Sequence, residues 1–390
     1  MDDQRPDGPP PRIGIDRPES FSYSVFHERH PALIANLIRD FPYPPRLRDR
    51  LEALLAESLD GTVPPEVPPG PNAPFWESQI AERAGRPWRA LPFIWAESYF
   101  YRRLLEAVEY FEPDSAWHGV DLFAPQKHAQ LDGPEILADL DAYAALTERD
   151  PYERRQALLH ASLWGNQADL GFRTTNAIEG RGAVVVDDSA ALWDLVDGPV
   201  DRPVILVADN AGRELTADLA LADSLLETGA GAVELHLKPH PYFVSDATGH
   251  DVLATLDAIG ANPNDAVRAL AERLRTAIRT GRLRLRAHPC YVLPSTYHHL
   301  PPDLARDFAD AKLVILKGDL NYRRLVGDRE WDAATAFGEV ADYFPGAVAA
   351  LRTAKSDLAV GIAPARLAEL DSGRPDWRIS GTHAMIQVHV

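Results

Sequence analysis

Residues 203–230 read PVILVADNAGRELTADLALADSLLETGA, a short apolar run, a polar turn and an amphipathic stretch in succession. The apolar run predicts a β-strand at 204–207, and the later spacing of Leu and Ala predicts a helix over about 215–226. Asp209 and Asn210 fall in the turn between them. The fold depends on how often this strand, turn and helix unit recurs.

The same unit recurs at AVELHLKPHPYFVSDATGHDVLATLDAI, residues 232–259, and at KLVILKGDLNYRRL, residues 312–325. A further β-branched run, AVVVDD, occupies 183–188. Repeated strand and helix units joined by right-handed crossovers predict an α/β fold, with a mostly parallel sheet flanked by helices in a Rossmann-like, three-layer arrangement. We assign this α/β domain to 176–390.

The chain before this domain reads differently. Residues 1–18 are rich in Pro, Asp and Arg without periodicity, which predicts a flexible arm. Residues 19–175 are expected to form a helical N-terminal region packed on the sheet domain. Its helices are expected at about 47–59, 92–111, 136–146 and 153–163.

Charge and composition limit the classes of partner. The formal net charge is -18, with 58 acidic and 40 basic residues, which disfavours nucleic acid and anionic membranes as partners. The single cysteine, Cys290, excludes an intramolecular disulfide, and the acidic, Pro-rich start lacks the features of a signal peptide. No apolar run reaches the roughly 20 residues that span a bilayer. We therefore expect a cytoplasmic protein.

Acidic and amide side chains follow the apolar run of each unit. Because the carboxyl ends of parallel strands meet at one rim of a sheet, these side chains are expected to converge there. They are Asp209 and Asn210, then Ser245 and Asp246, then Asp319 and Asn321.

The oxygens of Asp209, Asn210 and Asp246 suit a hard divalent cation, which takes carboxylate and amide ligands and keeps waters for exchange. With only two carboxylates the cation keeps positive charge, so a phosphate oxygen can enter its shell. The alternative is that Asp209 and Asn210 cap the following helix.

Several cations lie near the last of these units. Lys317 either ends its strand or contacts a ligand, whereas Arg324 is expected on a solvated helix face. Arg323 could neutralise a phosphate. Lys355 is expected near a helix C-terminus, where a cation is favourable whatever the function.

Other chemistries have little support. His236 and His240 are four residues apart but on a predicted strand, so they do not form a helical zinc clamp. Cys290 is expected to be a buried structural thiol. Serine-hydrolase, nucleotide-phosphate and dinucleotide glycine motifs do not occur at a strand end.

Several segments together resemble the damage-control phosphatases, also called domain-of-unknown-function family 89. The likeness is to its sugar-phosphate phosphatase branch, which includes a eukaryotic protein proposed to be an acidic-residue methyltransferase. The segments, in chain order, are WAESYFYRRL at 95–104, SLWGNQADL at 162–170, ADNAGRELTADL at 208–219, FVSDATGHD at 243–251, LKGDLNYRRL at 316–325 and LRTAKSDLAVGI at 351–362.

The resemblance implies a Mn²⁺, Co²⁺ or Ni²⁺ ion, with Mg²⁺ as a further option, bound by Asp209, Asn210 and Asp246. These three residues and Asp319 would form the catalytic set. The residues implied to contact the substrate are Glu97, Asn166, Asp319, Asn321, Tyr322, Arg323 and Lys355.

The activity implied is hydrolysis of small phosphorylated metabolites, with fructose 1-phosphate and fructose 6-phosphate as the first substrates to test. Asp246 or Asp319 would act as the base, and a phosphoaspartate at Asp209 remains open. The Pro-rich arm and the stretch HLKPHPYFVSD at 236–246 depart from the family's eukaryotic members. The rival functions are an S-adenosylmethionine-dependent protein carboxyl methyltransferase and a non-catalytic sugar-phosphate sensor.

Overall fold

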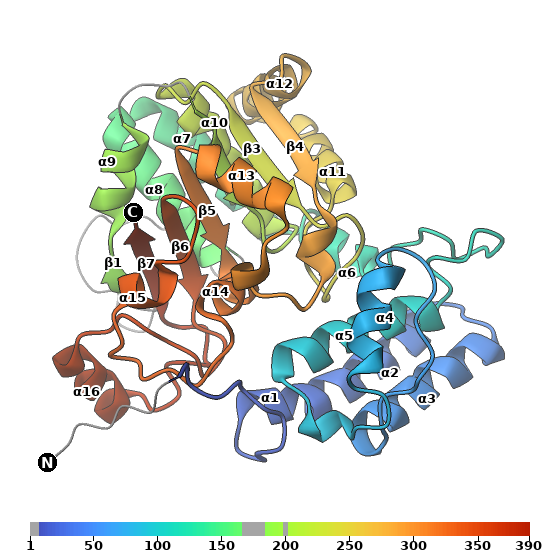
Figure 1. The fold of residues 1–390 in the computed structure, drawn as a ribbon. Helices are drawn as coiled ribbons and strands as arrows, with labels where there is room; N and C mark the ends of the chain where they lie inside the picture. Colours follow the sequence, from blue (N-terminus) through green and yellow to red (C-terminus); the bar gives the residue numbers. More distant parts are fainter. Residues whose placement is uncertain (1–7, 166–183, 198–201) are drawn as a thin grey trace, which may run out of the picture.

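The computed structural model describes residues 8–165, 184–197 and 202–390. They form an α/β body with a group of helices beside it, at the lower right of Figure 1. Within these residues no helix is both long enough and apolar enough to cross a membrane.

The described residues of the α/β body form a seven-stranded sheet in the order β1-β7-β6-β5-β2-β3-β4. From β6 to β4 neighbouring strands are parallel, β7 is antiparallel to β6, and β1 is parallel to β7. The prediction of a mostly parallel sheet is therefore confirmed. The strands are β1 (Val184–Asp187), β2 (Val204–Val207), β3 (Val233–Leu237), β4 (Leu283–Ala287), β5 (Leu313–Lys317), β6 (Val348–Thr353) and β7 (Ala384–His389).

Helices cover both faces of this sheet (Figure 1). Successive residues of a strand point to opposite faces, so Leu206 of β2 packs with α10 and α12 while Val207 packs with α13 and α14. The helices after β1 are α9 (Ser189–Val196), α10 (Arg213–Glu227), α11 (Gly249–Gly260), α12 (Asp265–Arg279), η5 (Pro289–Val292), η6 (Tyr297–His299), α13 (Pro302–Asp310), α14 (Gly318–Val326), α15 (Phe337–Ala341) and α16 (Pro364–Gly373).

The first helices form a hydrophobic core of their own, rich in aromatic rings such as Trp76, Trp88 and Phe100. α5 lies at its centre and is buried on several faces, as its bulky residues predict. The elements of this helical core are α1 (Phe21–Ser24), η1 (Val25–Arg29), α2 (His30–Asp40), α3 (Pro45–Asp60), α4 (Ala73–Ala81), η2 (Trp88–Ala90) and α5 (Phe93–Ala107).

The next helices belong to the sheet rather than to the helical core. Leu140 and Leu159 are buried in the same cluster as β2 and α10. The helical region expected before residue 175 therefore contains two sets of helices: one set packs in the helical core, and the other packs in the core of the sheet. These helices are α6 (Ala124–Ala129), α7 (Pro134–Ala145), η3 (Leu146–Glu148) and α8 (Pro151–Trp164), of which α7 and α8 reach the sheet's core.

The described part of the N-terminal arm has defined backbone contacts. The Ile13 amide donates to the Asp328 carbonyl at 3.1 Å, and the Phe93 amide donates to the Ile13 carbonyl at 2.8 Å. Residues 8–18, expected to be mobile, thus include a segment held between the start of α5 and the loop after α14. The composition of the arm favours mobility, but composition does not show that Ile13 finds main-chain hydrogen-bond partners at Asp328 and Phe93.

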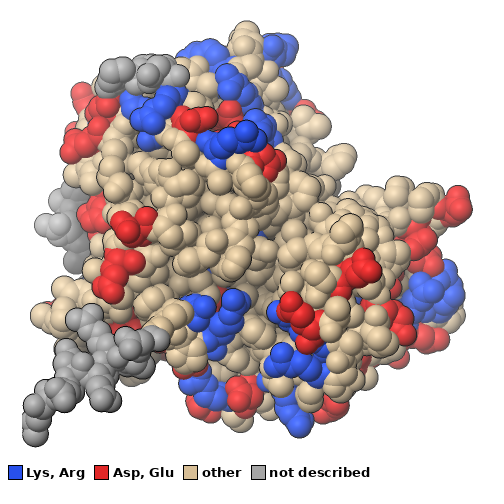
Figure 2. All heavy atoms as spheres, viewed as in Figure 1, with Lys and Arg blue, Asp and Glu red and all other residues tan. Residues whose placement is uncertain are grey.

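Charged residues of both signs are distributed over the face seen in Figure 2, around a broad uncharged region. Basic and acidic groups lie close together on this face rather than forming a uniform basic surface. The expectation that nucleic acid is not a partner stays a prediction.

A buried ion-pair cluster joins the helical core to α14. Arg323 Nη1 donates to Glu97 Oε2 at 2.9 Å, and Arg323 Nε donates to Asp328 Oδ1 at 2.7 Å. Asp328 Oδ2 also accepts from the Ile94 amide at 3.1 Å. Each charge is buried and paired, so removing one partner leaves another uncompensated.

Replacing Asp328 by Asn should therefore lower the free energy of unfolding by about 3–5 kcal/mol, measured by urea denaturation. Asn tolerates the positive φ of 52° at this position, so the loss reports the ion pair rather than backbone strain. Glu369→Gln is the control, because Glu369 pairs with Arg366 at the surface and should change stability by less than about 0.5 kcal/mol. Equal, small effects of both substitutions would contradict this account.

Candidate functional site

The candidate site lies where the order of strands reverses. From β2 the chain continues to β3 and β4 on one side, whereas β5 and β6 lie on the other side of β2. A crevice forms at the carboxyl ends of the two strands flanking such a switch point, and ligands of α/β sheets bind there. Asp209 and Asn210 follow β2, and Asp319 follows β5, at this point.

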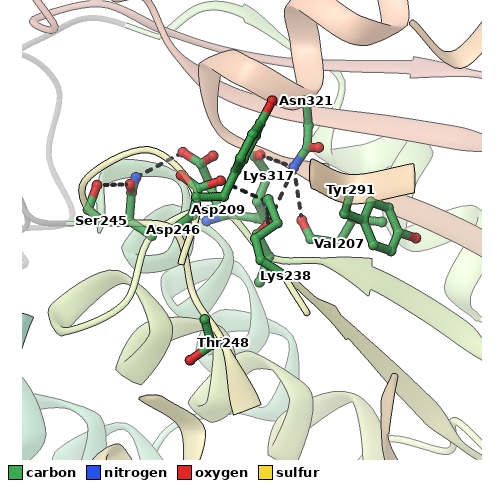
Figure 3. A network of polar contacts seen from close by, with 12 residues as sticks. Val207, Asp209, Lys238, Ser245, Asp246, Thr248, Tyr291, Lys317 and Asn321 are labelled. Atoms are coloured by element: carbon green, nitrogen blue, oxygen red, sulfur yellow. Dashed lines mark hydrogen bonds and ion pairs between the residues drawn. The ribbon is translucent and has the colours of Figure 1, made fainter. Parts of the chain in front are cut away.

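The loop after β3 brings Asp246 to the same place. The Ala211 amide donates to the Ser245 carbonyl at 2.7 Å, and the Ala247 amide donates to the Asp209 carbonyl at 2.8 Å. Asn210 and Asp246 form an antiparallel bridge between these bonds. Figure 3 shows the side chains of Asp209, Ser245 and Asp246 gathered at this junction.

The Asn210 amide is the centre of the polar contacts. Its Nδ2 donates to Asp209 Oδ2 and to Glu214 Oε2, both at 2.8 Å, while its Oδ1 accepts from the Ser245 hydroxyl. Asp246 Oδ2 lies 3.1 Å from Lys238 Nζ, which also donates to the Ala208 carbonyl. Each of these buried carboxylates therefore has an amide or ammonium donor beside it: Asn210 contacts Asp209 and Glu214, and Lys238 contacts Asp246.

Burial raises the pKa of both aspartates. The pKa of Asp209 is well above its ordinary value because of desolvation and the charges of Glu214 and Asp246, which outweigh Lys238 and Lys355. The pKa of Asp246 is raised by burial, against the effect of Lys238. Without a cation, the two carboxylates hold protons more tightly than exposed ones do.

The Lys317 ammonium contacts oxygens of the protein itself. Its Nζ lies 2.6 Å from the Ser162 carbonyl, 3.0 Å from Glu214 Oε1 and 3.0 Å from Asp218 Oδ1. Burial would lower the pKa of Lys317, but the two carboxylates raise it above its usual range. Of the two interpretations of Lys317, strand termination or ligand contact, the geometry favours an internal role.

The donor set fits a divalent cation. Asp209, Glu214, Asp218 and Asp246 are buried carboxylates, and the described lysines buried among them are Lys238 and Lys317, so the ionised cluster has a formal charge of -2. Asp246 Oδ2 is buried, and the charged group beside it is Lys238 Nζ at 3.1 Å. A dication at the Asp209, Asn210 and Asp246 oxygens would balance that charge.

The described part of the chain has no group of three or more His, Cys, Asp or Glu side chains placed to hold a metal ion, so a cation at Asp209 and Asp246 would also need oxygens from Asn210, water or substrate. His236 is buried between Tyr291 and Glu234, and its pKa is lowered by burial. Cys290 is buried and its pKa is raised by burial, as a structural thiol requires. An oxygen-ligand site that keeps water or substrate oxygens remains the one indicated by the geometry.

The polar residues of α14 have different surroundings. Asp319 Oδ1 accepts from Arg352 Nε at 2.6 Å and from the Ser356 hydroxyl at 3.0 Å. Burial would raise the pKa of Asp319, but Arg352 and Arg323 lower it, so this carboxylate is ionised at neutral pH. It is the α14 side chain best placed to accept a proton or a hydrogen bond.

Asn321 and Tyr322 are committed to internal hydrogen bonds. Asn321 Nδ2 donates to the Lys317 carbonyl at 2.8 Å, and its Oδ1 accepts from the Tyr297 hydroxyl at 2.7 Å. The Tyr322 hydroxyl accepts from the Val360 amide at 3.1 Å. Their contact with substrate stays a prediction. The bonds of Asn321 hold the start of α14, and the bond of Tyr322 joins α14 to the loop after β6.

The remaining predicted residues are placed as follows. Arg323 is buried between Glu97 and Asp328, and burial raises the pKa of Glu97 to about 7. Lys355 follows β6, so the expectation that it lies near a helix C-terminus was wrong. It is partly exposed, and its charge lowers the pKa values of Asp209 and Glu214, which places it on the site's side. Asn166 lies outside the described residues.

The expectation that Arg324 lies on a solvated helix face was wrong. Its guanidinium is buried and donates to the carbonyls of Cys290, Tyr291, Leu293 and Ser295. These acceptors come from the loop around η5, which covers that face of α14. Helical spacing alone does not show such a covering loop.

The sequence reasoning missed Glu214, Lys238 and Arg352. Glu214 lies four residues after Asn210, in the first turn of α10, and Lys238 follows the apolar run of β3 as Lys317 ends that of β5. The repeated strand-end lysine was the available signal. For Arg352, which holds Asp319 and the loop carrying Ser356, the sequence contained no comparable pattern.

Comparisons with known proteins show similarity over most of the chain. The family model of the Damage-control phosphatase ARMT1-like domain matches residues 25–370. Damage-control phosphatase ARMT1 of Xenopus laevis is 31% identical over 348 residues, 80% of this chain and 78% of that protein. The protein of that name from Homo sapiens is 29% identical over 347 residues, with the same coverage of 80% and 78%. The crystal structure of a family 89 protein from Pyrococcus horikoshii aligns with 90% of this chain and 94% of its own, at 14% identity and a TM-score of 0.46.

Gly318 gives a test of how closely the site is packed. Its φ is +81°, and a Cβ built there would overlap the Asp209 carboxylate. Gly318→Ala should lower the free energy of unfolding by about 2–4 kcal/mol, because left-handed strain adds to displacement of the carboxylate. The control is Gly249→Ala, where a Cβ meets nothing within 4 Å. Chemical denaturation measures the free energy of unfolding of both variants. Equal losses in the two variants would contradict the close packing of Gly318 against Asp209.

Proposed function

Because the chain belongs to the damage-control phosphatase family with the ARMT1-like domain, we propose that it is a metal-dependent phosphatase of small phosphorylated metabolites. The family resemblance inferred from the sequence segments is thereby confirmed. The names of the relatives support phosphatase activity. Metal dependence and the sugar-phosphate substrate are the parts proposed here.

One observation carries the proposal. The loop after β3 is hydrogen-bonded to the turn after β2, so the side chains of Asp209, Asn210 and Asp246 meet at the switch point of the sheet. Two buried carboxylates held this close, with raised pKa values, favour a cation between them.

We propose Mn²⁺, Co²⁺ or Ni²⁺, with Mg²⁺ as the alternative, at the oxygens of Asp209, Asn210 and Asp246. When bound, such an ion polarises a phosphoryl oxygen and lowers the pKa of a water molecule. The chain's own contribution is to hold these ligands in a buried site with a charge that matches a dication.

The phosphate is proposed to bind near the N-termini of α10 and α14. α14 begins directly after β5, and α10 begins after the turn that follows β2, so both helices start at the switch point. Their first free amides favour an anion there. Lys355 supplies positive charge on the same side. Arg323 is already paired with Glu97 and Asp328, so its contribution to substrate charge is smaller than that of Lys355.

Asp319 is the proposed group for accepting a proton or orienting a substrate hydroxyl. It is ionised, and Arg352 and Ser356 fix one of its oxygens. Asp246 is the less suitable base, because Lys238 faces it and the ligand role already uses it. A ketose phosphate remains the first substrate to test, with fructose 1-phosphate and fructose 6-phosphate as representatives.

The activity test measures phosphate release from a panel of sugar phosphates with Mn²⁺, Co²⁺, Ni²⁺, Mg²⁺ or a chelator. Asp246→Ala should lower kcat/KM by about 10³-fold or more, about 4 kcal/mol, because it removes a proposed cation ligand. Asp257→Asn is the control, since Asp257 is exposed and pairs with Arg275 away from the site.

The outcomes separate the rival functions. Unchanged turnover in folded Asp246→Ala protein would overturn the assignment. Tight binding of sugar phosphates without phosphate release would indicate a sensor. Methyl transfer from S-adenosylmethionine to protein carboxylates, again without phosphate release, would indicate a methyltransferase.

The pH dependence of cation binding gives an independent test. A carboxyl whose pKa is raised by folding stabilises the fold below its unfolded pKa of about 4. That contribution is lost as pH rises through the folded pKa, and the ionised carboxylates then repel each other. Mn²⁺ needs the ionised forms, so it should raise the melting temperature more at pH 7.5 than at pH 5.

Differential scanning fluorimetry of the metal-free protein, titrated with Mn²⁺ at both pH values, measures this difference. The apparent affinity should rise by up to about tenfold per pH unit for each proton released. The same Mn²⁺ shift at pH 5 and pH 7.5, or an undiminished shift in Asp246→Ala protein, would argue against these two carboxylates as ligands.

A further inference from the structure

A buried chain of polar contacts runs from α8 to the Asn210 amide. It starts at the Ser162 carbonyl, which accepts from Lys317 Nζ at 2.6 Å. Lys317 continues to Asp218 Oδ1 and to Glu214 Oε1, both at 3.0 Å. The sequence resemblance and the proposed chemistry assign no role to Glu214 or Asp218.

The spacing on α10 explains why one lysine reaches both acids. Glu214 and Asp218 are four residues apart, so they lie on the same face of the helix. Lys317 ends β5 directly opposite that face. Its ammonium has three hydrogens, and the three contacts to oxygen provide an acceptor for each of them.

Glu214 uses its two oxygens in different directions. Oε1 faces Lys317 at 3.0 Å, and Oε2 accepts from Asn210 Nδ2 at 2.8 Å. An amide group is planar, so fixing its nitrogen also fixes the direction of its oxygen. Asp218 contacts the same lysine but not Asn210 in the described contacts, which makes it a natural comparison.

We propose that Glu214 is a positioning residue, held by Lys317, that sets the orientation of the Asn210 amide toward the cation. The inference rests on the proposed cation site at Asp209, Asn210 and Asp246. Lys317 keeps Oε1 of Glu214 occupied and so keeps this carboxylate from turning into the site as a ligand. Lys317 accordingly acts within the protein and does not contact the phosphate.

Side chains that hydrogen-bond to a metal ligand orient it, and their removal commonly weakens metal affinity by 10–100-fold. Glu214→Gln places an amide NH₂ or a differently directed oxygen against Asn210, so Asn210 keeps its contacts with Asp209 and Ser245 but loses the Glu214 carboxylate that helps to set its orientation. Its Mn²⁺ dissociation constant should rise by roughly 10–100-fold. Asp218→Asn should change that constant by less than about threefold, because the Glu214 to Asn210 contact remains.

Loss of a nearby negative charge would also weaken cation binding, so the experiment includes a double-mutant cycle. Free Mn²⁺ is measured by electron paramagnetic resonance for the wild type and for Asn210→Ala, Glu214→Gln and the double variant. If Glu214 acts through Asn210, Glu214→Gln should weaken binding by less than about threefold in the Asn210→Ala background.

The outcomes are distinct. The same fold-loss from Glu214→Gln in both backgrounds would show that only its charge matters and would overturn the inference. Equal losses for Glu214→Gln and Asp218→Asn would overturn it as well, as would an unchanged dissociation constant in Glu214→Gln. Thermal melts without Mn²⁺ identify the folded variants used in the cycle.

A wild-type protein that does not bind Mn²⁺, Co²⁺, Ni²⁺ or Mg²⁺ would overturn the proposed cation site and this inference together. A wild type that binds the cation, with additive effects in the cycle, would overturn the positioning role alone. The two failures are therefore distinguishable.

Discussion

The main-chain hydrogen bonds between 209–211 and 245–247 are the constraint on which the site depends. β2 and β3 are parallel neighbours, and after β3 the chain turns back so that this short segment pairs antiparallel to the turn after β2. Asp246 therefore lies beside Asn210 by backbone geometry rather than by side-chain attraction. Attraction could not do this, because the carboxylates repel each other when ionised.

Two strand-end lysines make the burial of so many acids tolerable. Lys238 follows β3 and Lys317 ends β5, and each directs its ammonium at buried carboxylates. A buried charge without a partner costs several kcal/mol, so each lysine is needed where it stands. The ionised cluster nevertheless keeps an excess of negative charge, which is the basis for proposing a dication there.

The sequence predicted much of this arrangement, because strand ends of a parallel sheet leave a local signature. The apolar run of β2 was placed at 204–207, where the structure has it, and the turn after it supplied Asp209 and Asn210. What the sequence could not show was the partner of each buried face. α7 and α8 looked like part of the helical region, yet their apolar stripes pack against the sheet.

The same reason explains the polar side chains that were misjudged or missed. Arg324 occupies a helix position that solvent could reach, until the loop around η5 covers it. Glu214 reads as an ordinary acid in the first turn of α10, and only the fold shows that Lys317 and Asn210 lie on its two sides. Periodicity reports that a face is buried, whereas long-range topology decides which groups meet there.

The helical core contributes to the site by holding the loop that carries Asp246. Phe243, in the loop that carries Asp246, has a φ of +48°, a conformation that costs an aromatic residue about 1–3 kcal/mol. Its ring stacks on Tyr101 of α5 with centroids 4.7 Å apart, and the neighbouring Tyr242 hydroxyl lies 2.6 Å from the Ser98 hydroxyl. Contacts from α5 thus offset the strain that turns this loop back toward Asp209. Because the backbone pairing of Asp246 depends on that turn, the proposed cation site requires both the sheet and the helices beside it.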